Sequence, residues 1–150
     1  MYAVTIEVDF CYGHRLMDYV GKCMHPHGHN GRVQIEVQAP ALDRRGMVRD
    51  FGDVKQAVRN WVEKELDHQM ILRRDDPLLP VLQQMGEPCF VMERNPTAEA
   101  LAQLFFDHMA GHGFPVTAVR FWETPTSFAT YAKPPASSPA ASRETLEAEA

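Results

Sequence analysis

The chain has 150 residues, of which 45% are hydrophobic and 23% are charged, and this is the composition of one ordinary globular domain. That composition argues against disorder of the whole chain, and no apolar run approaches the roughly 20 residues of a membrane span. The net charge of −5 has the wrong sign for a protein that binds nucleic acid or an anionic membrane.

The cysteines and the first residues indicate the compartment. Cys11, Cys23 and Cys89 are odd in number, and no two of them form a Cys-x-x-Cys pair. This pattern argues against a disulfide framework and suits a reducing environment. The first residues also lack the basic and apolar segments of a secretory signal. We therefore expect a soluble, cytoplasmic protein.

Two stretches near the start of the chain alternate between apolar and polar side chains. The even positions are apolar over residues 2–10, and the odd positions are apolar over residues 33–39, so each stretch predicts a half-buried strand. Residues 11–30 lie between them and hold two of the three cysteines and four of the seven histidines. A connection of this length without regular structure is uncommon and often functional.

Helical spacing of apolar residues predicts two long helices in the rest of the chain. Asp50 is expected to cap the first, and Asn95-Pro96-Thr97 is expected to begin the second. The intervening residues 69–94 are less regular. The expected elements are a helix over residues 51–66, a short helix over residues 75–85, a strand over residues 89–92 and a helix that ends at residues 111–113.

Two further strands are expected at residues 116–123 and 128–132. The order β-β-α-insert-α-β-β favours an α+β fold in which an antiparallel sheet of four strands carries helices on one face. The domain is expected to cover residues 1–132, and the Pro-, Ala-, Ser- and Glu-rich residues 133–150 are expected to form a flexible tail. A sheet of this kind has two exposed edges, so we expect the chain to oligomerise.

Three histidines, His14, His27 and His29, have the spacing of a metal site. His27 and His29 lie on one face of an extended segment because side chains in a strand alternate, and His14 shares the parity of the apolar face of the first strand. Three neutral imidazoles from neighbouring strands suit tetrahedral zinc with an open fourth position. His25 is an alternative ligand, and a solvated histidine-rich loop is the alternative to a metal site.

Six short motifs occur in order over residues 2 to about 132. They are Phe10-x-x-x-His14-Arg15-Leu16, Cys23-x-x-x-His27-Gly28-His29-Asn30, Asp50-Phe51-x-x-Val54-Lys55, Leu66-Asp67-His68, Asn95-Pro96-Thr97-x-Glu99 and Glu123-Thr124. In these motifs and in their order, the chain resembles the 6-pyruvoyltetrahydropterin synthase / 6-carboxytetrahydropterin synthase family.

This resemblance implies the T-fold, an antiparallel sheet of four strands with two helices on one face. In that family three subunits join sheet edges into a barrel, and two trimers stack as a homohexamer. The resemblance implies that zinc is bound by His14, His27 and His29, and that Cys23 is the catalytic cysteine. It implies a proton relay of Asp67 and His68, which Glu123 joins. It also implies that Glu123 anchors the pterin and that Thr97 lies near the substrate.

These residue types fit the implied chemistry. Zinc with an open position can bind the hydroxyl groups of a pterin side chain and acidify neighbouring protons, and a thiolate at Cys23 can remove one of them. Asp67-His68 can pass a proton on near neutral pH, and Glu123 can accept two hydrogen bonds from the donor edge of a pterin. The structural alternatives are an inert loop thiol, a charge pair at a helix C-terminus and a surface carboxylate at a strand end.

The chain departs from the family pattern at four places. Tyr12-Gly13 stands where small residues usually precede the first zinc histidine, and Gly31 stands where an aromatic residue is frequent. Residues 69–94 form a longer insert than a compact member has, and the tail is additional. The acidic net charge also requires local cations for a triphosphate substrate, for which the candidates are Arg15, Lys22 and Arg32.

Three residues separate Cys23 from His27, and a gap of this length resembles that of the bacterial queuosine branch of the family. The resemblance therefore implies a zinc-dependent lyase that converts 7,8-dihydroneopterin triphosphate to 6-carboxytetrahydropterin, acetaldehyde and triphosphate. The alternatives are a 6-pyruvoyltetrahydropterin synthase and a non-catalytic protein that binds zinc or a pterin. A folate-pathway member is disfavoured, because that group places Glu at the position of Cys23.

Overall fold

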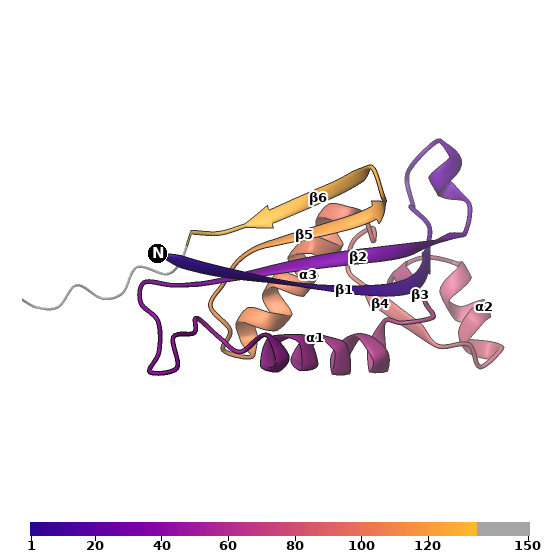
Figure 1. Ribbon diagram of the computed structural model, residues 1–150. Helices are drawn as coiled ribbons and strands as arrows, with labels where there is room; N and C mark the ends of the chain where they lie inside the picture. The colour runs from indigo at the N-terminus through magenta and orange to yellow at the C-terminus, as the bar shows by residue number, and fades with distance from the viewer. Residues whose placement is uncertain (135–150) are drawn as a thin grey trace, which may run out of the picture.

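The computed structural model describes residues 1–134 and shows an α+β fold built on one mixed sheet of six strands (Figure 1). The strands lie side by side in the order β4-β3-β1-β2-β5-β6. In chain order they are β1 (Tyr2–His14), β2 (His27–Ala39), β3 (Gln69–Arg73), β4 (Cys89–Met92), β5 (Val116–Thr124) and β6 (Ser127–Ala132). The helices are α1 (Phe51–Glu65), α2 (Leu78–Gln84), α3 (Ala98–Gly111) and the 3-10 turn η1 (Lys22–Met24).

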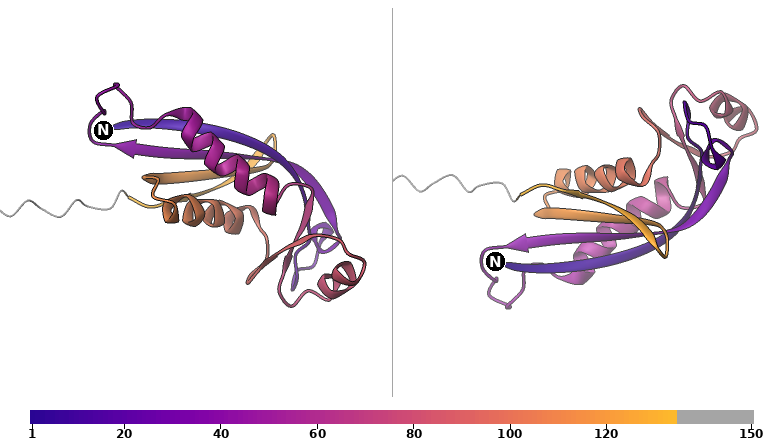
Figure 2. Two further views of the ribbon diagram at one scale, coloured as in Figure 1. Left: turned by 90° about the horizontal axis from the view of Figure 1, so that it is seen from below. Right: turned by 90° about the horizontal axis from the view of Figure 1, so that it is seen from above.

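The antiparallel hairpin of β1 and β2 forms the centre of the sheet, and its register ends with His14 opposite His27. The alternation predicted for both strands is confirmed, because Val8, Phe10 and Ile35 are at most 5% exposed. α1 and α3 cover this apolar face, whereas no helix of the described chain covers the opposite face (Figure 2). We call the uncovered side the open face.

Both strands of the hairpin extend beyond the stretches in which apolar and polar side chains alternate. β1 continues through His14 and β2 already begins at His27, so the connection expected over residues 11–30 shrinks to residues 15–26. Glycines and histidines in this part of the chain carry little strand signal of their own. Pairing between the two strands extends them, and tertiary context overrides the weak local preference.

Side-chain caps begin both long helices, as predicted. Asp50 Oδ1 accepts a hydrogen bond from the backbone N–H of Gly52 at 2.7 Å. Thr97 Oγ1 accepts one from the backbone N–H of Ala100 at 3.2 Å. Each cap satisfies a backbone donor that the first helical turn leaves free. The buried stripes beyond them pack against the sheet and include Val54, Val58 and Val62 of α1 and Leu101, Phe105 and Met109 of α3.

The prediction of a sheet of four antiparallel strands is wrong, because the sheet is mixed and has six strands. The two long helices on one face and the short helix predicted over residues 75–85 are confirmed as α1, α3 and α2. β3 pairs in parallel with the end of β1, and β4 pairs in parallel with β3. β3 has no alternating pattern because its neighbouring residues Ile71 and Leu72 are both fully buried. α2 is a third helix, and it lies beside β4 at the same end of the sheet (Figure 1).

The flexible tail expected from Lys133 onward lies, over residues 135–150, outside the described residues. Lys133 itself still belongs to the fold, because its backbone N–H donates to the carbonyl of Thr117 at 3.1 Å. Its ammonium group also lies 5.5 Å from the ring centroid of Tyr131. Within residues 1–134 we find no helix that is both long enough and apolar enough to span a bilayer.

An imidazole stacks on an indole where α3 packs beside α1. The ring centroids of His108 and Trp61 are 3.8 Å apart, and the ring planes differ by 10°. Burial lowers the pKa of His108, and the neighbouring His112 lowers it further. The folded protein therefore favours the neutral form of His108.

We expect the stability of the fold to decrease as the pH falls through the usual titration range of histidine. The unfolded chain then binds a proton at His108 that the folded chain resists. His108→Phe keeps a ring on Trp61 and removes this proton, so it should lose less stability than the wild type between about pH 8 and about pH 5. Urea unfolding at several pH values measures the difference, and identical pH dependence in the two proteins would contradict it.

Candidate metal centre

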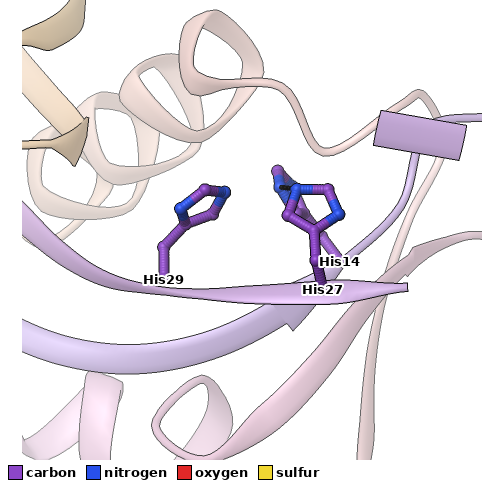
Figure 3. A group of neighbouring side chains, drawn as sticks. All are labelled: His14, His27 and His29. Atoms are coloured by element: carbon purple, nitrogen blue, oxygen red, sulfur yellow. Dashed lines mark hydrogen bonds between the residues drawn. The ribbon is translucent and has the colours of Figure 1, made fainter. Parts of the chain in front are cut away.

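Three histidine side chains meet where β1 ends and β2 begins (Figure 3). The hairpin register places His14 opposite His27 and Tyr12 opposite His29. One ring nitrogen of each histidine lies within 4.8 Å of the others. The structure therefore brings together the three predicted ligands. His25 is not part of this group, but its carbonyl contacts the ring of His27.

Backbone carbonyls fix the tautomer of two of these rings. Nδ1 of His14 lies 2.7 Å from the carbonyl oxygen of Pro96, and Nδ1 of His27 lies 2.7 Å from that of His25. Because a carbonyl only accepts, both Nδ1 atoms donate, and each neutral ring then has a lone pair at Nε2. The two Nε2 atoms are 3.0 Å apart. A cation shared between them relieves the repulsion of the lone pairs.

The third imidazole completes a donor set that fits a metal ion. Nε2 of His29 is buried and has no hydrogen-bond partner among the described residues. Burial lowers the pKa of His14 to about 4, against the hydrogen bond to Pro96 and together with the charges of His27 and His29. Burial also lowers the pKa of His29. Burial thus favours the neutral form of His14 and of His29, which is the form that binds a divalent metal.

Glu123, Cys23 and Thr97 line a hollow of ≈ 360 Å³ that also reaches His14. Oε1 of Glu123 is 3.9 Å from Nε2 of His14. Burial raises the pKa of Glu123, although the nearby His27 opposes this effect. Cys23 is a half-buried free thiol in η1. The hydroxyl of Thr97 accepts the cap hydrogen bond of α3 and keeps its own O–H available as a donor.

The connection that carries Cys23 is tied to the insert of residues 69–94 and to the residue that follows it. Arg15 makes two hydrogen bonds to the buried carboxylate of Asp76, one of them 2.8 Å long from Nε to Oδ2. The side chain of Asn95 binds the backbone N–H of Met17 at 2.8 Å and its carbonyl at 2.7 Å. Sequence reasoning missed Asp76 and this use of Asn95, since 61 residues separate Arg15 from Asp76 and no local pattern links them.

Two of the three candidate cations for a triphosphate are already paired. Arg15 binds Asp76, and Arg32 on the open face binds Asp9 at 2.9 Å. The remaining candidate, Lys22, is exposed and directly precedes Cys23. Of the three candidates, Lys22 alone makes no ion pair with the described residues.

Asp67 and His68 lie on the other side of the sheet. Oδ2 of Asp67 is 2.8 Å from Nδ1 of His68. The pair is attached to β1 because Oδ1 of Asp67 accepts from the backbone N–H of Cys11 at 3.0 Å, and the N–H of His68 donates to the carbonyl of Cys11 at 2.7 Å. Both side chains line a hollow of ≈ 650 Å³ that includes Asn30 and Trp122 but not Cys23. One protomer thus keeps the predicted relay apart from the predicted catalytic cysteine.

The two departures from the family pattern closest to the histidines contact each other. A Cβ on Gly31 would come within 2.9 Å of Cε1 of Tyr12 and 3.1 Å of the ring of Phe121. The ring of Tyr12 therefore fills the space that an aromatic side chain at position 31 would need. Burial raises the pKa of Tyr12 and the charge of Glu123 adds to this effect, so the phenol stays neutral. The two departures are therefore compatible with each other, because the aromatic ring at position 12 takes the space that the glycine at position 31 leaves free.

Comparison with known proteins assigns this chain to one family. A model of the 6-pyruvoyl tetrahydropterin synthase family matches residues 3–134, which is most of the chain. The chain belongs to this family, as the ordered motifs predicted.

Two relatives in this family have the same enzyme name. The 6-carboxy-5,6,7,8-tetrahydropterin synthase of Rickettsia conorii is 33% identical over 135 residues, which cover 85% of this chain and 98% of the relative. The enzyme of the same name from Aquifex aeolicus is 38% identical over 125 residues, which cover 75% of this chain and 76% of the relative. Among solved structures, an uncharacterized protein of Wolinella succinogenes has a TM-score of 0.75 and 27% identity, with 89% of this chain and 98% of that chain covered.

The contact between Tyr12 and Gly31 predicts that substitutions at the two positions have non-additive effects on the free energy of unfolding. Gly31→Phe alone should destabilise the fold by about 1–3 kcal/mol through overpacking, and Tyr12→Ala alone by about 3–5 kcal/mol through a cavity. The double variant should be more stable than the sum of the two losses by at least about 1 kcal/mol, because the new ring fills the new space. Urea unfolding of all four proteins measures the coupling, and additive losses would disprove it.

Proposed function

We propose that the protein is a zinc-dependent 6-carboxytetrahydropterin synthase that converts 7,8-dihydroneopterin triphosphate to 6-carboxytetrahydropterin, acetaldehyde and triphosphate. The observation that carries this proposal is the group of three histidine nitrogens next to a hollow lined by Cys23 and Glu123. Relatives with this name that align over most of the chain support the reaction. The three free cysteines suit a cytoplasmic location.

The three histidines, the thiol and the carboxylate each have a role in this proposal. Zinc held by His14, His27 and His29 supplies a Lewis acid that makes protons next to a bound hydroxyl more acidic. Cys23 is the base that removes such a proton. Glu123 accepts hydrogen bonds from the donor edge of the pterin, for which its two oxygens are a planar match.

Two further residues are proposed to contact the substrate, Thr97 in the same hollow and Lys22 next to Cys23 in the sequence. Thr97 still has a free O–H donor after capping α3, so it can bind an oxygen or ring nitrogen of the pterin. Lys22 precedes Cys23 on the exposed side of η1 and is the proposed contact for the triphosphate. An exposed ammonium attracts such an anion as a point charge.

The proposed assembly is a homohexamer of two stacked trimers. Within the described residues, β3 pairs only with residues 12–14 of β1, so residues 2–11 of that strand have one free edge. β6 forms the opposite edge of the sheet. Pairing of such edges between copies closes a barrel. Assembly would also place Asp67 and His68 of one subunit beside Cys23 of a neighbour, which a single protomer does not do.

Release of acetaldehyde tests the proposed reaction. We expect zinc-loaded protein to produce acetaldehyde and triphosphate in equal amounts, together with 6-carboxytetrahydropterin. Triphosphate and a 6-pyruvoyl product without acetaldehyde would refute the proposal in favour of a 6-pyruvoyltetrahydropterin synthase. Tight binding of a pterin by the zinc-loaded protein without any product would refute it in favour of a non-catalytic protein.

Two alanine substitutions should separate metal binding from catalysis. His27→Ala leaves two imidazoles, so zinc content and activity should both fall. Cys23→Ala leaves all three nitrogens, so zinc should stay at about one ion per chain while turnover falls at least about 100-fold. Elemental analysis and the acetaldehyde assay measure both effects. If Cys23→Ala loses its metal as severely as His27→Ala, the thiol is a metal ligand and not the base.

Mixed oligomers should show that one site needs two subunits. Cys23→Ala and His68→Ala are each expected to be inactive. After unfolding and refolding the two variants together in equal amounts, about a quarter of the sites should combine an intact Cys23 with an intact His68. The acetaldehyde assay on the mixture measures this recovery, and each variant refolded alone is the control. An inactive mixture, or a stable monomer in light scattering, would contradict the proposed assembly.

A further inference from the structure

Tyr12 carries a buried hydroxyl group that no protein atom satisfies. The residue is 3% exposed. Its hydroxyl oxygen and Nε2 of His29 are the two buried side-chain polar atoms without a hydrogen-bond partner in residues 1–134. A hydroxyl left in this state costs about 1–3 kcal/mol, and a phenylalanine would fill the same space without that cost. Two such atoms on paired residues indicate a ligand that the protein alone does not supply.

The hydroxyl belongs to the metal end of the site. Tyr12 lies opposite His29 in the hairpin, and the centroid of its ring is 5.6 Å from that of His29 and 5.2 Å from that of His14. On the core side, the rings of Phe10 and Phe121 lie 5.5 Å and 5.7 Å from it. Aromatic rings on this scale of distance hold the phenol ring in place beside the imidazoles, and its hydroxyl oxygen is buried.

We propose that the Tyr12 hydroxyl donates a hydrogen bond to an oxygen atom of the ligand that fills the metal site. This inference rests on the proposed function, under which that oxygen belongs to the side chain of the pterin. A neutral phenol is a suitable donor, because it binds an uncharged hydroxyl or carbonyl oxygen and adds no charge beside Glu123.

The contact with Gly31 gives this donor its place. A Cβ at position 31 would come within 2.9 Å of the ring of Tyr12, so the glycine lets the phenol ring keep its place beside the imidazoles. A small residue at position 12, which the family pattern has, brings no hydroxyl to the imidazoles. Tyr12 is therefore a residue that selects ligands with an oxygen near the metal. A site built to donate to a ligand oxygen discriminates against ligands that lack it.

Tyr12→Phe removes the hydroxyl and keeps the ring over Gly31. The zinc-loaded wild type and variant are titrated by calorimetry with two pterins: 7,8-dihydroneopterin, whose side chain has hydroxyl groups, and 6-methyl-7,8-dihydropterin, whose side chain has none. We expect the preference of the wild type for the hydroxylated pterin to fall about fivefold in the variant. The affinity for the methyl pterin should not change, because that ligand offers no oxygen to Tyr12.

Zinc content and urea unfolding are the controls for this variant. The zinc content and the free energy of unfolding should equal or exceed those of the wild type, because the hydroxyl makes no hydrogen bond to the described residues. An unchanged preference between the two pterins would overturn the inference. So would equal loss of affinity for both pterins or a decrease in stability, since the hydroxyl would then act on the structure of the site and not on the ligand.

A second probe separates this inference from the proposed function. If the wild type binds neither pterin, the proposed function fails, and the role of Tyr12 is decided with Co²⁺ in place of zinc. Visible absorption then reports the binding of acetate oxygen to the metal. Binding about fivefold weaker in Tyr12→Phe would support the donor role. Equal binding by wild type and variant would overturn it.

Discussion

The register of β1 against β2 is the constraint on which both the core and the metal centre depend. The pairing that places His14 opposite His27 also places Tyr12 opposite His29 and directs the side chain of Ile35 into the core. A slip of one residue would move every one of these side chains to the other face of the sheet. Burial of apolar area beneath α1 and α3 therefore selects the same pairing that collects the imidazoles. Hydrophobic packing holds the ligand geometry.

Much of this arrangement could be predicted because period-two alternation and helix caps are local signals. The parity of His14 with Phe10 indicated which face the ligand occupies, and Asp50 indicated where α1 begins. β3 could not be predicted, since adjacent buried residues such as Ile71 and Leu72 give no alternation. Its partner is a strand more than fifty residues earlier in the chain, and only the folded sheet creates that contact.

The motifs predicted residues that share one hollow, but not how the remaining residues are divided between the two sides of the sheet. The motifs that point to Cys23 and to Asp67-His68 say nothing of which side of the sheet each occupies, and the structure places them in different hollows. His68 lies at a φ of 59°, where the chain turns from α1 into β3, and it is bound there to the backbone of β1. The insert has a comparable role. Through Asp76 it fixes the connection that bears Cys23, so its extra length supports the site and is not an appendage.

The energetic cost of this fold is concentrated at the metal centre. Nε2 of His14 and Nε2 of His27 lie 3.0 Å apart, and the buried polar atoms of His29 and Tyr12 have no hydrogen-bond partner in the described protein. Each unmet group disfavours the folded state by about 1–3 kcal/mol, and the aromatic and aliphatic core must offset that sum. A metal ion bound by the three imidazoles would remove the cost at the nitrogen atoms in the folded state alone. Metal binding and folding would therefore be linked, because the unfolded chain does not hold the three nitrogens together.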